Sequence, residues 1–202
     1  GIDEIFIDLS AVPGASLDLA QRIKAAVREA TGLTCSMGIA PNRLLAKLCS
    51  DLDKPNGLTL LAAREIPDRI HPLPVGQVNG IGPKATQRLA QLGVHTLGEL
   101  AGCAPQWLHH HFGARYGDFL WHAAHGIDDT PVVTRSAPRS VSRETTFERD
   151  LHPRHDREQL NAIFAHLCRR VAADLEHKGV WGRTIGVKLR YPDFRTLTRD
   201  LT

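Results

Sequence analysis

The sequence predicts a multi-domain protein of mixed α/β (α+β) class, and three observations support this. Strand and helix patterns alternate over residues 1–63, short helices punctuated by glycine fill residues 64–130, and residues 139–202 combine one long amphipathic helix with an alternating strand. Residues 131–138 hold two prolines and few large apolar side chains, which is typical of a linker. With 202 residues, 42% of them hydrophobic, the chain is long enough for two or three small domains.

Residues 1–63 alternate between the two kinds of periodicity. Apolar side chains alternate in the candidate strands and recur at helical spacing in the candidate helices. The expected order is strand 5–9, a helix from Ser16 to Gly32, strand 33–39, a helix from Asn42 to Lys54, and strand 58–61. This βαβαβ order predicts a sheet layer covered by helices, whose opening elements we expect before Gly1.

The middle segment predicts a small all-helical module. Gly80-Ile81-Gly82-Pro83 opens one helix and Gly93 closes it, Thr96 caps the next, and Pro105 suits the first turn of a third.

The last segment changes character again. Residues 139–147 are expected to be extended, apolar side chains from Leu160 to Leu175 form one face of a helix that stops at Gly179, and residues 184–191 alternate between an apolar and a basic face. Because two strands and a helix are marginally stable alone, we expect the rest of this module after Thr202.

Composition excludes several classes of protein. No apolar run is long enough to span a membrane, and the start of the chain lacks the pattern of a signal peptide, so a cytoplasmic protein is expected. The four cysteines form no CxxC pair and are interpreted as reduced thiols rather than as a disulfide framework or a zinc ribbon. The net charge is only +3, but residues 139–202 contain 13 Lys or Arg against 9 Asp or Glu, which suits a module that holds a polyanion.

Asp3 and Glu4 precede the first apolar strand and form a candidate metal site. Mg²⁺ takes carboxylate oxygens and shares its shell with substrate phosphates. An isolated acidic pair at a strand start is more often merely solvated, and strict strand alternation would point the two carboxylates to opposite faces. Lys54, where a helix ends and the chain reverses, offers a point charge for a phosphate; the alternative is an ordinary helix-terminal lysine.

The segment from Val78 to Lys84 is a more specific signal. Gly80 and Gly82 allow close backbone approach at a helix N-terminus and Lys84 adds charge, as in a helix-hairpin-helix that grips the DNA backbone without reading sequence. The alternative is a plain tight turn between helices.

A basic sheet face is the last candidate for DNA contact. It would hold Arg139, Ser140, Arg143, Lys188 and Arg190, and the alternative is a solvated basic surface. The many histidines between residues 71 and 125 lack the spacing of a metal site and are interpreted as solvated or half-buried helix residues.

Five stretches in a fixed order resemble the Y-family DNA polymerases, most closely the bacterial polymerase IV branch. They are Ile2-Asp3-Glu4 leading into Phe6-Ile7-Asp8, Met37-Gly38-Ile39-Ala40-Pro41-Asn42 with Leu45-Ala46-Lys47, Ser50-Asp51 with Lys54-Pro55-Asn56-Gly57, Gly80-Ile81-Gly82, and Arg139-Ser140-Val141. Gly1 and Asn79 depart from the family, which usually has serine and proline there.

The resemblance implies a right-hand arrangement. Residues 1–63 would be the later part of a ferredoxin-like palm, residues 64–130 the thumb, and residues 139–202, after the linker, the beginning of the little finger. Asp3 and Glu4 match the catalytic and metal-binding carboxylates, and Lys54 matches the lysine that contacts the incoming triphosphate. The implied reaction is translesion DNA synthesis, in which two Mg²⁺ ions assist nucleotidyl transfer from a dNTP to the primer 3′-hydroxyl.

The resemblance also implies parts outside this chain. The first metal-binding aspartate, the residue that excludes ribonucleotides and the fingers would precede Gly1, and a sliding-clamp peptide would follow Thr202, so residues 1–202 alone are expected to be inactive. The expected partners are primer–template DNA, a dNTP and the sliding clamp, with no membrane and a monomeric protein. The competing hypotheses are a catalytically silent relative, a DNA-binding repair factor, and a metal-dependent nuclease with a helix-hairpin-helix.

Overall fold

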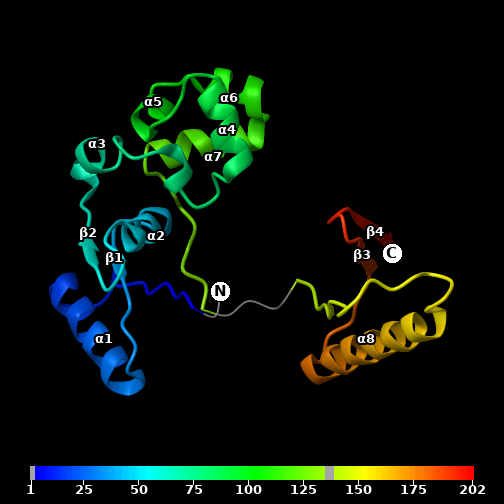
Figure 1. Ribbon diagram of the computed structural model, residues 1–202. Helices are drawn as coiled ribbons and strands as arrows, with labels where there is room; N and C mark the ends of the chain where they lie inside the picture. The colour runs from blue at the N-terminus through cyan, green and yellow to red at the C-terminus, as the bar shows by residue number, and fades with distance from the viewer. Residues whose placement is uncertain (1–2, 135–138) are drawn as a thin grey trace. The chain divides into compact units, whose positions relative to one another are not determined.

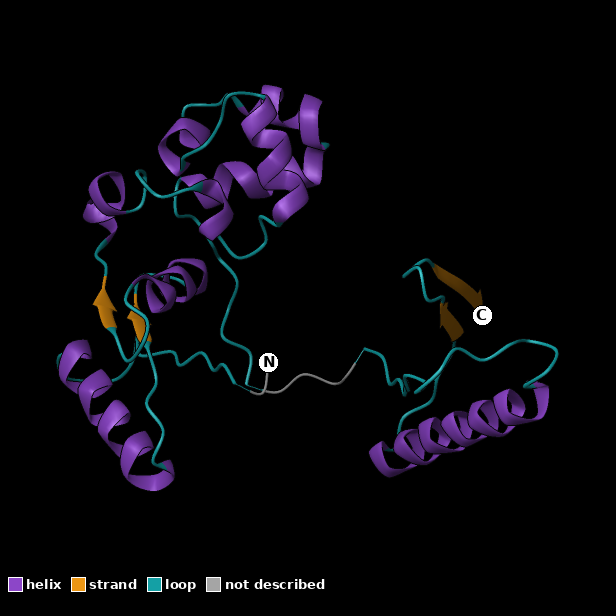
Figure 2. Cartoon of the chain, viewed as in Figure 1, coloured by secondary structure: helices purple, strands orange, loops and turns teal. Residues whose placement is uncertain are grey.

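A computed structural model describes residues 3–134 and 139–202, so Gly1, Ile2 and the end of the predicted linker lie outside the described residues. The described chain forms two compact units, one up to Thr134 and one from Arg139 onward (Figures 1 and 2). Helices and small sheets are mixed, as the sequence predicts. None of the helices in the described ranges combines the length and apolar character that a membrane span requires.

A small βαβ element forms the start of the first unit. Strand β1 (Met37–Ile39) pairs in parallel with β2 (Leu58–Leu60), and helix α2 (Arg43–Leu52) connects them. Helix α1 (Ser16–Thr31) precedes them, and both helices contact the two strands (Figure 1). Gly38 lies so close to α2 that a Cβ there would meet the Ser50 nitrogen at 2.5 Å, which explains a glycine in the middle of β1.

Two predicted caps in this part are confirmed, whereas Ser16 is the first residue of α1 and not its N-cap, which is Ala15 without a side-chain bond. The Asn42 side chain accepts a hydrogen bond from the Leu45 amide at 3.0 Å, as an N-cap does. Gly32 ends α1 in the left-handed region at φ 72°.

One strand prediction was wrong and another was confirmed only in part. Residues 5–9 form no strand, and Ile5 is 80% exposed; the predicted strand 33–39 is reduced to β1. Alternation of apolar side chains reports which face a strand would bury, but a strand also needs a neighbouring backbone. Within the described residues, β1 and β2 pair only with each other.

The helical part of the first unit follows β2. Its elements are the 3₁₀ turn η1 (Ala63–Glu65), α3 (Ile66–Arg69), the 3₁₀ turn η2 (Val75–Gln77), α4 (Pro83–Gln91), α5 (Leu97–Ala101), α6 (Pro105–Phe112) and α7 (Ala114–Ala124). Thr96 caps α5 in a capping box with Glu99, and Pro105 begins α6, as predicted. Helix α7 packs against α5 and α6.

A continuous apolar core joins the βαβ element to these helices. It includes Leu45 and Leu48 of α2 together with Leu89, Leu108 and Leu120 of α4, α6 and α7, all nearly inaccessible to solvent. The part of the chain before residue 64 and the helices after it therefore share one core rather than two.

The chain leaving α7 is tied to the N-terminus of α2. The side-chain amide of Asn42 donates from Nδ2 to the Gly126 carbonyl at 2.7 Å. Asp128 Oδ2 accepts a hydrogen bond from the backbone amide of Leu44 at 3.0 Å. Arg43 Nη1 donates to the Pro131 carbonyl at 3.2 Å. The first residues of α2 thus carry three bonds to residues 126–131.

The second unit is one long helix and a hairpin. Helix α8 (Arg157–Lys178) ends at Gly179 in the left-handed region, as predicted, and β3 (Ile185–Arg190) pairs antiparallel with β4 (Thr196–Leu201). Residues 139–147 carry no strand assignment.

Candidate functional site

Helix α2 carries the central charged groups of the candidate site. Lys47 and Asp51 lie one turn apart on this helix, and Lys54 follows just after its end. The leucines of the opposite face, Leu45 and Leu48, are buried in the core, so the amphipathic pattern that builds the helix also fixes the direction of its charged face.

Four side chains of alternating charge form a chain of ion pairs. Lys47 Nζ lies 2.5 Å from Glu4 Oε1 and 3.0 Å from Asp51 Oδ2, and Lys54 Nζ lies 2.6 Å from Asp51 Oδ1. The predicted catalytic Glu4 and the predicted nucleotide-binding Lys54, 50 positions apart in sequence, are thereby connected through two residues of α2.

The ion pairs change the proton affinities of their members. The hydrogen bond to Glu4 is the main cause of the raised pKa of Lys47, and partial burial opposes it. Partial burial also disfavours the charged form of Asp51, but hydrogen bonds from Lys54 and Lys47 outweigh this and place the pKa of Asp51 below its ordinary value. Lys47 and Asp51 are therefore both charged at neutral pH.

The turn after α2 presents Lys54 to solvent. Its side chain is 54% exposed, although its ammonium pairs with Asp51. Asn56 adopts φ 55°, and a Cβ at Gly57 would overlap the Asp53 carbonyl, so the turn closes tightly on the end of α2. The Gly57 carbonyl accepts from Met37 at 3.1 Å, which connects the turn to β1.

Asp3 and Glu4 are the candidate ligands for a hard cation. Both are exposed, and over residues 3–134 and 139–202 no group of three or more His, Cys, Asp or Glu side chains is placed to hold a metal. Two adjacent carboxylates without a third donor suit Mg²⁺, which takes one or two carboxylates together with substrate phosphates. They do not suit a structural Zn²⁺ site, which takes four protein ligands.

The predicted hairpin of the helical part has the expected shape. Gly80 is at φ 103° and Gly82 is the N-cap of α4, with no heavy atom within 4 Å of the position of a Cβ. The Tyr116 hydroxyl donates to the Gly80 carbonyl at 2.8 Å, which fixes the hairpin to α7. Lys84 is exposed in the first turn of α4, so the open side of the hairpin combines free backbone with a cation.

In the second unit, the basic residues predicted to bind DNA differ in their surroundings. Lys188 and Arg190 alternate along β3 on the face opposite Val187 and Leu189, and all four are exposed. Arg139 and Ser140 are also exposed. Arg143 is a different case: its guanidinium forms a two-pronged pair with Asp174 of α8, Nε to Oδ2 at 2.5 Å and Nη2 to Oδ1 at 2.7 Å.

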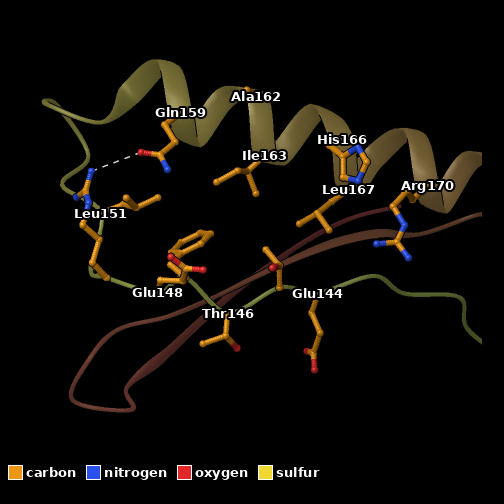
Figure 3. A pocket seen from close by; sticks show the side chains of 13 residues that line it. Glu144, Thr146, Glu148, Leu151, Gln159, Ala162, Ile163, His166, Leu167 and Arg170 are labelled. Carbon is orange, nitrogen blue, oxygen red and sulfur yellow. Dashed lines mark hydrogen bonds between the residues drawn. The ribbon is translucent and has the colours of Figure 1, made fainter.

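A surface hollow of the second unit lies between residues 144–151 and α8 (Figure 3). Gln159, Ile163 and Leu167 line it from the helix, with Thr146 and Leu151 on the facing segment. Its lining mixes apolar side chains with charged ones such as Glu144 and Arg170. None of the predicted site residues lines this hollow.

Several residues of the site could not be found from the pattern of the sequence. Lys47 stands within a motif that carries the resemblance, but its partner Glu4 is 43 positions away. Lys24, which bonds to the turn of Lys54, and Asp174, which pairs with Arg143, left no local signal. The four cysteines are free, in agreement with the prediction of reduced thiols.

Three family models match the chain in order and cover most of it. Residues 1–51 match the impB/mucB/samB family, residues 76–128 match the thumb domain of DNA polymerase-iota, and residues 138–202 match the C-terminal domain of the impB/mucB/samB family. The chain belongs to this family, the Y-family DNA polymerases.

Similar curated proteins come from bacteria and an archaeon. The chain is 39% identical over 204 residues to DNA polymerase IV of Alkalilimnicola ehrlichii, matching 100% of this chain and 56% of that protein. It is 43% identical to DNA polymerase IV of Methanoculleus marisnigri (100% and 55%) and 37% identical to DNA polymerase IV 1 of Bacillus subtilis (100% and 49%). The chain thus spans about half the length of the curated relatives it matches.

Proposed function

We propose that the protein to which this chain belongs is a template-directed DNA polymerase that carries out translesion synthesis. The observation that carries the proposal is the chain of ion pairs from Glu4 through Lys47 and Asp51 to Lys54. It connects a carboxylate suited to Mg²⁺ with an exposed lysine suited to a triphosphate, in a family whose curated members are named DNA polymerase IV.

In this proposal each residue has a separate task. Bound Mg²⁺ would activate the primer 3′-hydroxyl and stabilise the charge that develops on the transferred phosphoryl group. Asp3 and Glu4 supply the carboxylates that hold the metal, Lys54 binds the phosphates of the dNTP, and Lys47 and Asp51 keep Glu4 and Lys54 in place.

DNA would be held through its phosphates by both units. The amides around Gly80 and Gly82 and the ammonium of Lys84 form one contact, and Arg139, Ser140, Arg143, Lys188 and Arg190 are proposed as the other. We further propose that residues 1–63 are the later part of a ferredoxin-like palm, residues 64–130 the thumb, and residues 139–202 the beginning of the little finger.

Two Mg²⁺ ions, a dNTP and the sliding clamp are proposed as ligands and partners of the complete protein. We propose that it works as a monomer in the cytoplasm. These properties rest on the family to which the chain belongs rather than on the geometry of the site.

Primer extension by the full-length protein tests the proposal. Asp3→Asn and Glu4→Gln are each expected to reduce extension by at least about a hundredfold while DNA binding is retained, because both remove a metal-binding carboxylate. Lys54→Ala is expected to raise the KM for dNTP. Asp8→Asn is the matched control, because Asp8 is an exposed carboxylate of the same segment that accepts only a local bond from the Ser10 amide.

The competing functions give different results in the same assay. If the protein were a silent relative or a DNA-binding repair factor, the wild type itself would bind primer–template without extending the primer. A nuclease would shorten the primer in the presence of Mg²⁺. If Asp3→Asn and Glu4→Gln both extended primers like the wild type, the assignment of these carboxylates would be wrong.

A further inference from the structure

Lys24 of α1 makes an unusual set of contacts for a lysine at the surface of a helix. Its Nζ donates to the carbonyl and the side-chain oxygen of Asn56 at 3.0 and 2.8 Å and to the Gly57 carbonyl at 3.1 Å. It also donates to the Cys35 carbonyl. Since an ammonium has only three N–H groups, four acceptors share them, and the lysine is fully engaged.

All four acceptors are neutral oxygens. Among the described residues no carboxylate lies within ion-pair distance of Lys24, which is half-buried. Hydrogen bonds that involve a charged donor are stronger than those between neutral groups. Lys24 is thus directed at one place in the backbone, where Cys35, two residues before β1, lies near the turn after α2.

That point is the turn that carries Lys54. Asn56 adopts φ 55°, a conformation that L-residues seldom take, and Lys24 bonds to both the carbonyl and the side chain of this residue. Gly57 is held from the other side, because its amide donates to Ser36 Oγ at 3.2 Å. The backbone that presents Lys54 is therefore fixed from α1 and from the approach to β1.

We propose that Lys24 is a positioning residue for the nucleotide: by bonding to Asn56 and Gly57 it fixes the turn from which Lys54 reaches the triphosphate. The proposal rests on the proposed polymerase function. Lys24 does not touch the substrate in this account. Its effect passes through the turn, so loss of Lys24 weakens dNTP binding through a displaced Lys54.

Single-turnover primer extension by the full-length protein tests this inference. In Lys24→Met we expect the Kd for dNTP to rise about tenfold, the Kd for DNA to stay within about twofold, and the maximal rate to fall less than the affinity. Lys24→Arg keeps the charge and several donors and is expected to recover most of the dNTP affinity. The matched control is Arg22→Met on the same helix, because the Arg22 side chain is exposed and forms no hydrogen bond or ion pair within the described ranges.

A second measurement does not depend on polymerase activity. Hydrogen exchange of the full-length protein is expected to be faster in Lys24→Met than in Arg22→Met at the amides of Gly57 and Met37, which both bond within this junction. Asn56→Gly removes one acceptor of Lys24 while tolerating the positive φ, so it tests the contact from the turn even if Lys24→Met folds poorly. It is expected to raise the Kd for dNTP in the same direction.

The outcomes separate this inference from the proposed function. If Lys54→Ala weakens dNTP binding while Lys24→Met and Asn56→Gly leave it unchanged, the positioning role of Lys24 is overturned and the polymerase assignment stands. If the wild type extends no primer, the polymerase assignment fails. The proposed effect of Lys24 on nucleotide binding then fails as well. Unchanged exchange at Gly57 and Met37 in Lys24→Met would overturn the structural part of the inference.

Discussion

Gly80 and Gly82 occupy the same hairpin but need to be glycine for different reasons. Gly80 has φ 103°, and a Cβ there would meet the ring of Phe119 at 2.6 Å, so folding itself requires a glycine. Gly82 has an ordinary φ of −75° and open space around it, so the fold would accept a side chain. Because Gly82 has no side chain, the backbone at the start of α4 remains accessible.

We therefore expect opposite results from substituting the two glycines. Gly80→Ala should destabilise the first unit by about 1–3 kcal/mol, because the alanine meets both strain and overlap. Gly82→Val should change stability by less than about 1 kcal/mol but lower the affinity for duplex DNA, because the side chain blocks close approach of a phosphate. Urea denaturation and DNA titration of both variants measure the two effects, and equal DNA affinity in Gly82→Val and wild type would remove the hairpin from the DNA contact.

At the scale of secondary structure, two carboxylates of the second unit, one just before α8 and one within it, pair with arginines of the preceding segment. Asp156 accepts from Arg149 Nη2 at 2.7 Å and from the His152 amide at 2.7 Å, and its pKa is lowered far below the ordinary 3.8, chiefly by Arg149. The hydrogen bonds from Arg143 likewise lower the pKa of Asp174. Both pairs fasten the segment before α8 to the helix.

These shifts predict how the second unit responds to acid. A carboxyl group whose pKa is lower in the folded state contributes stability that is complete above its unfolded pKa, here about 3.8, and is lost as the pH falls below it. We expect these two groups to add no pH dependence between pH 7 and about 5, and a loss of α8 helicity below about pH 4. Circular dichroism during acid titration checks this, and Asp156→Asn should flatten the acid limb; an unchanged limb would contradict the prediction.

The sequence predicted where helices begin and end better than it predicted which strands pair. Asn42, Gly32, Thr96 and Gly179 were found because caps act within a few residues. The strand at residues 5–9 was predicted wrongly because alternation carries no information about a neighbouring strand.

The candidate site shows the same division between local and distant information. The place of Lys54 at a helix end was visible in the sequence, but its role in nucleotide binding was implied only by the resemblance. The contacts of Lys24 with Asn56 and of Arg143 with Asp174 join residues about 30 positions apart, and each depends on how elements pack.

At the scale of the whole molecule, the charge of residues 139–202 should govern how DNA binding depends on salt. Each phosphate neutralised on duplex DNA contributes about −0.9 to the slope of log K against log[salt]. Arg139→Ala should flatten the slope by about 0.9, whereas Arg143→Ala should flatten it less, because Asp174 already balances the charge of Arg143. The double variant should therefore flatten the slope by between about 1 and 2.

Titration of the full-length protein with duplex DNA at several salt concentrations measures these slopes. Gly82→Val removes no charge and lies in the other unit, so its effect on affinity should add to that of Arg139→Ala with little further change in slope. An unchanged slope after loss of both arginines would show that this basic surface does not meet the phosphates.

Helix α2 connects two distant parts of the first unit. The helix is ten residues long, about 15 Å at 1.5 Å per residue. Its N-terminal end is bonded to residues 126–131, where the chain leaves the last helix of this unit, and its C-terminal end carries the ion pairs of Glu4 and Lys54. Since one helix with a buried apolar face carries both sets of bonds, the chain that leaves α7 and the charged groups near Lys54 are fixed at opposite ends of a single packed element.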